Sequence, residues 1–242
     1  MLALFLLNNT PQRRIYGVLL IIAGFTAMLT QSSGTLFVGL PVGIISVLIL
    51  SLRRRAIIPL IGLTILASIA MIVALQFPRF SNLLDFTQGT NFYRLRVWDS
   101  AIQMVLHHPI TGIGLDQFLY AFRGTYIMPD AWQEPTLSHP HNIMLDFWTR
   151  LGISGVLWII GVQIVFWQRL LRHYRQQQTQ HNQMTLALTI GTMGAMAGLL
   201  AHGLVDNSVF VIDLAYIFML LLYIAASIPN TSAIDEGAKT VV

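Results

Sequence analysis

Two histidines lie two residues apart and directly before an asparagine in the stretch LSHPHNIMLDF (137–147). Histidine exchanges protons near neutral pH, so His139 or His141 can take a proton from a hydroxyl group. Two further interpretations are open. The rings can be structural and hydrogen-bond neighbouring carbonyls, or they can bind a metal ion together with Asp130 or Glu134. On these residues alone a structural role comes first, catalysis second and metal binding third, because a His-x-His pair by itself is a weak metal signal.

Two arginines precede the histidines, in the stretch NFYRLRVWDSAIQMVLHH (91–108). A guanidinium presents a planar fork of donors and stays charged, so Arg94 and Arg96 suit a pyrophosphate better than lysine does. They can instead contact lipid headgroups or form a surface ion pair with Asp99. The only lysine is Lys239, so cations are not scattered over the chain, which favours the phosphate interpretation. Helical phase slightly favours Arg96 as the phosphate contact.

An amphipathic helix is the element expected to position these arginines. The stretch 91–108 has helical periodicity, and Pro109 ends it. We expect this helix to lie at a membrane interface, anchored by Trp98. The expected apolar stripe is Leu95, Trp98, Ala101, Ile102 and Val105, and the expected polar stripe is Arg96, Asp99, Ser100, Gln103 and His107.

A second helix is expected to follow the histidines. Asn142 is a good N-cap for a helix starting near Ile143, and the side chains of Asp146 and Arg150, four residues apart, can pair on that helix. Further along, Asp206 follows an apolar run. Asp213 is expected inside the last apolar run, where an ionisable group is costly and suggests function or an interhelical partner.

The composition predicts a membrane protein. Hydrophobic residues make up 55% of the 242 residues, charged residues 10%, and the mean hydropathy is +0.67. Soluble domains carry about 25% charged residues, so this chain has too little polar surface for a soluble fold. The net charge of +4 does not indicate nucleic acid, because the arginines cluster at the ends of apolar runs. There is no cysteine, which excludes disulfides and thiolate metal sites.

The predicted fold class is all-α, a polytopic membrane protein with about six spans and an outer loop of short helices. The apolar runs are 15–30, 35–51, 56–76, 151–168, 184–205 and 209–228. They divide the chain into N-terminal membrane helices (1–76), an extracytoplasmic loop carrying the chemistry (77–150), C-terminal membrane helices (151–228) and a cytoplasmic tail (229–242). The positive-inside rule puts both termini in the cytoplasm, because the arginine groups at 13–14, 53–55 and 169–175 would share one side.

Three motifs in this order resemble the O-antigen ligase and polymerase superfamily of bacterial membrane proteins. The first is YRLRVWDSAIQMVLHHPITGIGLDQF (93–118), with an arginine–tryptophan helix before His-Pro-x-x-Gly-x-Gly. The second is SHPHNIMLDFWTRLGISGVLW (138–158), and the third is HGLVDNSVF (202–210), with its outer aspartate. The resemblance covers about residues 20–225, and it is specific for the superfamily rather than for one member.

The resemblance implies a metal-independent, inverting glycosyltransferase of the bacterial inner membrane, without cofactor. The donor would be a glycan on polyprenyl pyrophosphate, and the acceptor a hydroxyl of a lipid-A core, a polysaccharide or a protein. Arg94 or Arg96 would hold the pyrophosphate, and His141 would be the base, assisted by His139. Asn142, Asp206 and Trp98 would support them. Membrane lipids are further expected partners, and nucleic acid is not.

The chain departs from the family pattern in two ways. Family members usually have about twice as many spans, so this chain resembles their C-terminal half. The family also often has an arginine after a serine near the first aligned spans, where this chain has Gly34 in TQSSGT (30–35). A ligase is preferred over a polymerase. The remaining candidates are a transporter and an inactive truncated homologue, although few polar residues in the runs are suited to line a transport path.

Overall fold

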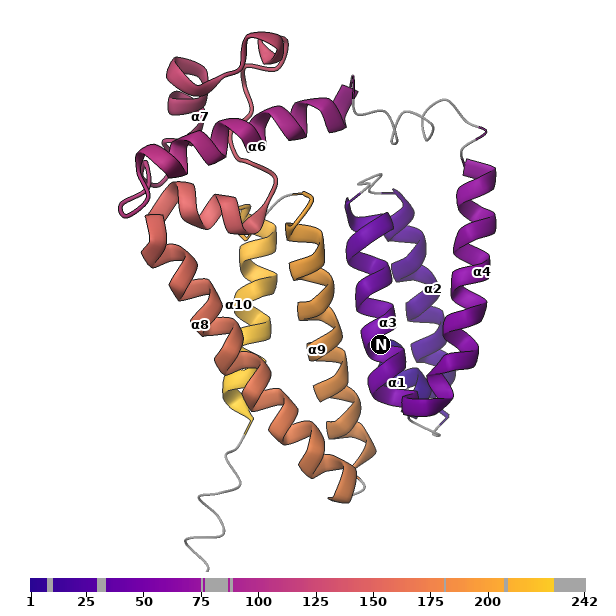
Figure 1. Cartoon of the computed structure of the whole chain (residues 1–242). Coiled ribbons are helices and arrows are strands. Elements are labelled where there is room, and N and C mark those ends of the chain that lie inside the picture. Colours follow the sequence, from indigo (N-terminus) through magenta and orange to yellow (C-terminus); the bar gives the residue numbers. More distant parts are fainter. Residues whose placement is uncertain are drawn as a thin grey trace, which may run out of the picture.

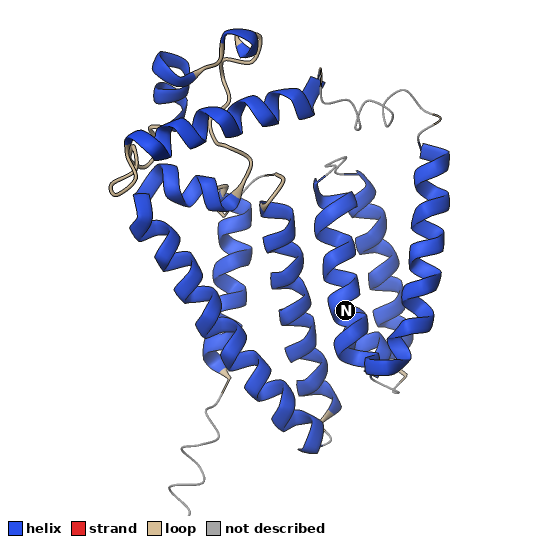
Figure 2. Cartoon of the chain, viewed as in Figure 1, coloured by secondary structure: helices blue, strands red, loops and turns tan. Residues whose placement is uncertain are grey.

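The computed structural model describes residues 1–7, 11–29, 34–74, 76, 87, 89–180, 182–206 and 209–228, and every regular element in these residues is a helix (Figures 1 and 2). The longer helices are α1 (Leu2–Leu7), α2 (Arg13–Leu29), α3 (Leu40–Leu52), α4 (Ile57–Ala74), α6 (Gly89–His107), α8 (Ile143–Gln180), α9 (Gln183–Gly203) and α10 (Ile212–Ser227). The short ones are η1 (Thr35–Gly39), η2 (Arg53–Ala56), α7 (Phe118–Ala121), η4 (Phe122–Tyr126) and η5 (Pro129–Ala131). The predicted all-α class is therefore confirmed for the described residues. The predicted tail at 229–242, and most of 77–88, lie outside them.

Three helical stretches are long and apolar enough to cross a membrane: Thr35–Ile69, Ile143–Thr179 and Gln183–Gly203, with Ile212–Ser227 as a shorter apolar helix. Within the first stretch the chain reverses its direction, because Arg53 has φ 53° and ψ −123° at the end of α3. Figure 1 shows α3 and α4 running in opposite directions on the two sides of η2. The chain is thus a helical membrane protein, and the number of about six spans stays a prediction.

Close backbone contact joins the two halves of the bundle. Gly43 on α3 and Gly39 at the end of η1 face glycines on α9. A Cβ added to Gly43 would lie 3.2 Å from the Gly194 carbonyl oxygen, and one added to Gly198 would lie 2.8 Å from the Gly39 carbonyl oxygen. Small residues allow this approach of helices in a membrane. On the other face of α9, buried side chains of α8, α9 and α10, among them Phe166, Leu170, Met193, Met196 and Phe218, form the main core.

Helix α6 lies across one end of the bundle, between the outer turns (α7, η4 and η5) and the first part of α8 (Figure 1). Because α6 packs against both the outer turns and α8, it carries apolar side chains on two faces. The side of α6 toward the outer turns buries Val97, Ala101 and Met104 against Phe118 and Phe122. The predicted single stripe is therefore wrong in part.

The errors in the predicted stripes are specific. Leu95 and Ile102, expected in the apolar stripe, are 39% and 44% exposed. Ser100, expected in the polar stripe, is fully buried, and its hydroxyl donates to the Tyr126 carbonyl oxygen at 2.7 Å. A buried hydroxyl with a carbonyl partner carries little desolvation cost, which is why a serine can face the outer turns.

Two glycines attach the turn after α6 (residues 108–117), which we call the glycine turn, to helix α8. Gly152 has φ 66° and bends α8 after its first two turns, and a Cβ there would overlap the Ile110 carbonyl oxygen. Gly112, with φ 64°, approaches the Thr149 carbonyl oxygen in the same way. The Ile113 amide donates to the Thr149 carbonyl oxygen at 2.7 Å, and the Ile153 amide to the Pro109 carbonyl oxygen at 3.0 Å. These contacts fix α6 relative to the histidine-bearing end of α8.

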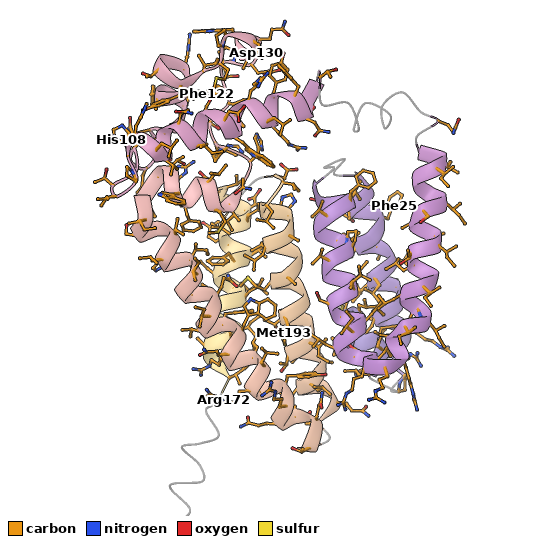
Figure 3. All side chains as sticks on the ribbon, viewed as in Figure 1. Phe25, His108, Phe122, Asp130, Arg172 and Met193 are labelled. Carbon is orange, nitrogen blue, oxygen red and sulfur yellow. The ribbon has the colours of Figure 1, made fainter. Side chains whose placement is uncertain are left out.

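The predicted arginine groups lie at the opposite end of the bundle from α6. Helix α2 begins at this end, the turn η2 lies there, and Arg172 lies at the same end of α8 (Figures 1 and 3). Asp130 and Phe122 lie at the other end, in the outer turns (Figure 3). The molecule thus has a polar end built from α6 and its turns, and an arginine-rich end.

Candidate functional site

Three distant segments bring charged side chains together at the carboxylate of Asp206. An Nη2 atom of Arg94 on α6 lies 3.6 Å from Asp206 Oδ2, and the Nδ1 atom of His141, just before α8, lies 3.6 Å from Asp206 Oδ1. The side chains of Arg94, His141 and Asp206 are only 18%, 20% and 13% exposed. We call these three residues the Asp206 cluster. Partial burial strengthens their electrostatic coupling relative to a surface pair.

Asn142 joins the histidine turn to the end of α9 that carries Asp206. Its Oδ1 accepts from the Met144 and Leu145 amides at 3.0 and 3.1 Å, so the predicted N-cap of α8 is confirmed. Its Nδ2 donates to the Leu204 carbonyl oxygen at 3.0 Å. One side chain therefore satisfies both helix ends and holds His141 beside Asp206.

The two histidines lie against each other. The His139 and His141 ring centroids are 4.3 Å apart with an interplanar angle of 50°. His141 has φ 51°, a left-handed backbone that residues other than glycine rarely adopt, and Ser138 Oγ lies 3.0 Å from His139 Nδ1. The turn thus places both rings at one point, with His141 next to the carboxylate and His139 behind it.

Two donors in the Asp206 cluster are left without hydrogen bonds among the described residues. The Nε atom of Arg94 and the Nδ1 atom of His141 are both buried and lack a hydrogen-bond partner. Arg94 uses one Nη1 donor on Asn91 Oδ1 at 3.4 Å. Buried donors without partners are uncommon in folded proteins, and here two of them occur in one cluster. An anion bound beside Arg94 would satisfy its Nε donor, whereas the acceptor that faces His141 Nδ1 is Asp206 Oδ1, at 3.6 Å.

Arg96 points away from this cluster. Its guanidinium lies 2.7 Å from Asp130 and 3.4 Å from Asp99, and it stacks over the Phe92 ring at 5.0 Å. Asp130, one of the acidic residues that could have joined the histidines at a metal, is thus an ion-pair partner in the outer turns. The structure brings Arg94 and not Arg96 to the histidines, although helical phase favoured Arg96.

The remaining predicted residues have other surroundings. Trp98 is half-buried against the apolar cluster that joins α6 to the outer turns, and its indole N–H has no hydrogen-bond partner among the described residues. Asp213 lies within the last helix as expected, but near its start. It is exposed in the first turn of α10, where the helix dipole favours a carboxylate.

The predicted pair of Asp146 and Arg150 is confirmed, but it is buried. Arg150 Nε lies 2.6 Å from Asp146 Oδ1, and Arg150 Nη1 lies 3.0 Å from Asp116 Oδ1 in the glycine turn. The guanidinium also lies over the Phe210 ring at 4.7 Å. This ion pair ties the glycine turn and the start of α10 to α8, beneath the histidines.

Sequence reasoning missed the direct contact of Gly34 with the cluster. A Cβ at Gly34 would lie 2.7 Å from both Cβ and Oδ2 of Asp206. The carboxylate therefore occupies the space that any side chain at position 34 would take. Asn91, the partner of Arg94, was also missed, and its spacing of three residues before Arg94 on a helix is the signal that points to it.

No group of three or more histidine, cysteine or acidic side chains is gathered in metal-binding geometry within the described ranges. The Asp206 cluster instead combines a guanidinium, an imidazole and a carboxylate. This set can bind an anion, orient an imidazole and accept a proton.

Comparison with known protein families connects this site to a family. A family model described as O-Antigen ligase matches residues 18–160, which include the arginine helix and the histidine turn. Asp206 lies beyond the matched range and joins these motifs only in space. No curated protein matches the chain.

Proposed function

Because the chain belongs to the O-Antigen ligase family, we propose that it transfers a glycan from a polyprenyl-pyrophosphate carrier to an acceptor hydroxyl at the outer face of the inner membrane. The observation that carries the proposal is the convergence of Arg94 and His141 on Asp206, with a buried unpaired donor on each of the two. The acceptor is a hydroxyl of a lipid-A core, a polysaccharide or a protein. Both termini and the arginine-rich end then face the cytoplasm.

Arg94 would bind the pyrophosphate. Its Nε donor is buried and unused, and a planar guanidinium can donate two parallel hydrogen bonds to phosphate oxygens. Asp206, 3.6 Å from the guanidinium, is too far for a hydrogen bond and holds Arg94 without using up its donors. Arg96, paired with Asp130 and Asp99, would instead stabilise the outer turns over α6.

His141 would be the general base. With Nδ1 turned to Asp206, a proton on Nδ1 faces the carboxylate, and Nε2 is left to accept the proton of the acceptor hydroxyl. This is the division of roles found in catalytic triads, where the carboxylate fixes the tautomer and stabilises the charged imidazole. The distance of 3.6 Å is long for a hydrogen bond, and such contacts often tighten when substrate binds. His139 would support the His141 ring from the other side.

The proposed step conserves atoms and charge. The acceptor oxygen bonds to the anomeric carbon on the face opposite the pyrophosphate, so the configuration inverts. The bond from that carbon to the pyrophosphate oxygen breaks, and its electron pair stays on the polyprenyl pyrophosphate. The hydroxyl proton moves to His141. The cluster therefore gains one positive charge as the leaving group gains one negative charge, which stabilises the transition state.

A defined reaction tests this proposal. The protein is reconstituted in liposomes with a synthetic polyprenyl-pyrophosphate glycan and an acceptor glycan, and the product is analysed by mass spectrometry and NMR. We expect a new glycosidic bond of inverted configuration and release of polyprenyl pyrophosphate. Matched liposomes holding the Asp206→Asn variant are the control and should give little product. Absence of any transferred glycan with several acceptor classes, or release of the intact donor on the opposite side, would contradict the proposal.

A further inference from the structure

A groove on the outside of the bundle runs along α8 towards the arginine-rich end. Its upper part, of about 510 Å³, is bounded by apolar side chains of α8 and α9, including Ile160, Ile164, Trp167 and Leu200. Its lower part, of about 410 Å³, is bounded by Gln168, Leu171, Arg172, Arg175 and Gln176. Gln168 and Leu171 border both parts, so the two form one continuous groove.

The lower end of the groove carries two free cations. Arg172 and Arg175 are exposed and make no ion pair or hydrogen bond with the described residues. Arg169, one turn earlier, differs: its guanidinium donates to the Ala226 and Ile228 carbonyl oxygens at 2.8 and 2.6 Å and closes the end of α10. No acidic residue occurs between positions 151 and 205 of the sequence. The two exposed guanidinium groups are therefore available to an anion from outside the chain.

We propose that this groove binds one anionic glycerophospholipid from the leaflet at the arginine-rich end. Arg172 and Arg175 are three residues apart and point to one side of the helix, where their donors can bind the phosphate. Gln168 lies one turn deeper, about 6 Å along the axis, and its exposed amide can donate to the ester carbonyl oxygens. Trp167, at the same depth, is a side chain typical of the membrane interface.

The dimensions of the groove fit an acyl chain. From Arg172 to Ile160 the helix rises about 18 Å, and half the hydrocarbon core of a bilayer is about 15 Å. An acyl chain anchored at the arginines would thus lie along Leu171, Ile164 and Ile160, and end near the bilayer centre. The site is separate from the Asp206 cluster, and this proposal does not rest on the glycan transfer.

Native mass spectrometry of the protein released from nanodiscs tests the proposal. The nanodiscs contain equal amounts of phosphatidylglycerol, which is anionic, and phosphatidylcholine, which has no net charge. We expect one retained phosphatidylglycerol and little phosphatidylcholine. The double variant Arg172→Gln/Arg175→Gln should lower this retention about tenfold or more, because each arginine near an anionic membrane surface contributes on the order of 1 kcal/mol.

Two further variants make the result specific. Arg54→Gln/Arg55→Gln removes an exposed pair from η2 at the same end but outside the groove, and it should retain the lipid. Ile164→Trp fills the groove and should lose the lipid with the arginines intact. Thermal unfolding in detergent checks that all variants are folded. Three results would overturn the proposal. The two double variants could lose phosphatidylglycerol equally, the Arg172→Gln/Arg175→Gln variant could retain it, or the unchanged protein could retain the two lipids equally.

Discussion

The Nδ2 atom of Asn142 donates a hydrogen bond of 3.0 Å to the carbonyl oxygen of Leu204, sixty-two residues later in the chain. This bond connects the turn that carries His141 to the end of α9 that carries Asp206. The same side chain caps α8 through its Oδ1 atom. In the proposed mechanism, the position of His141 relative to Asp206 thus depends on the side-chain amide of Asn142. Its Nδ2 donor and its Oδ1 acceptor can be tested separately.

Replacing Asn142 separates its two roles. Asn142→Asp keeps an acceptor for the α8 amides but loses the donor to Leu204, whereas Asn142→Ala loses both. We expect Asn142→Ala to lower the free energy of unfolding by about 2 kcal/mol, since the loss of an N-cap costs about 1 kcal/mol and the hydrogen bond to Leu204 contributes about as much. Asn142→Asp should lose less stability but still lose glycan transfer.

Thermal unfolding in detergent and transfer in liposomes measure the two effects. Equal transfer by Asn142→Asp and the unchanged protein would mean that the bond to Leu204 does not position the Asp206 cluster.

The two arginines of α6 should respond differently to the same conservative change. Arg94→Lys replaces the fork that points at the cluster by a single point charge, and should lower kcat/KM for the lipid-linked donor about tenfold to a hundredfold. Arg96→Lys should change kcat/KM less than about threefold, because Arg96 pairs with Asp130. The measurement is transfer rate against donor concentration. A larger loss in Arg96→Lys than in Arg94→Lys would show that Arg96 is the pyrophosphate contact.

The glycine that bends α8 should not tolerate a side chain. Gly152→Ala puts a methyl group against the Ile110 carbonyl oxygen and forces alanine into a left-handed backbone conformation. We therefore expect the free energy of unfolding to fall by about 3 kcal/mol or more, and the variant to accumulate poorly in membranes. Gly161, on the same helix, has no atom within 4 Å of an added Cβ. Gly161→Ala is the matched control and should be at least as stable as the unchanged protein. Similar accumulation of both variants would show that the glycine turn is not held against α8.

A side chain at Gly34 should disturb Asp206 directly. Gly34→Ala brings a methyl group to 2.7 Å from the Asp206 side chain and should lower transfer by moving the carboxylate from His141. Gly24, on α2, has open space around an added Cβ, so Gly24→Ala should leave transfer unchanged. Transfer rates at equal membrane levels compare the two, and unchanged transfer in Gly34→Ala would remove Asp206 from the proposed mechanism.

Local signals in the sequence predicted the local structure well. The proline after His108 and the periodicity before it predicted α6, which spans Gly89–His107. The amide of Asn142 predicted the start of α8, and the spacing of Asp146 and Arg150 predicted their pair. These features depend on residues at most four positions apart, where helix geometry alone determines contact.

The sequence could not predict which arginine faces the histidines. The prediction assumed that α6 has one apolar face, as a helix at a membrane interface does. The outer turns cover a second face, bury Val97 and Met104, and supply Asp130 as a partner for Arg96. That rearrangement depends on contacts between segments far apart in the sequence. The contact of Gly34 with Asp206 is likewise tertiary, and nothing near Gly34 in the sequence indicates it.

The measurement that tests the central claim most directly compares His141→Ala with His108→Ala in the liposome transfer reaction, at equal amounts of folded protein. His108 is an exposed histidine at the end of α6, outside the Asp206 cluster. Loss of a general base lowers rates roughly a hundredfold to ten-thousandfold, so His141→Ala should lose transfer by that factor, while His108→Ala should keep it. Transfer by His141→Ala at the rate of the unchanged protein would contradict the claim that the Asp206 cluster performs the reaction.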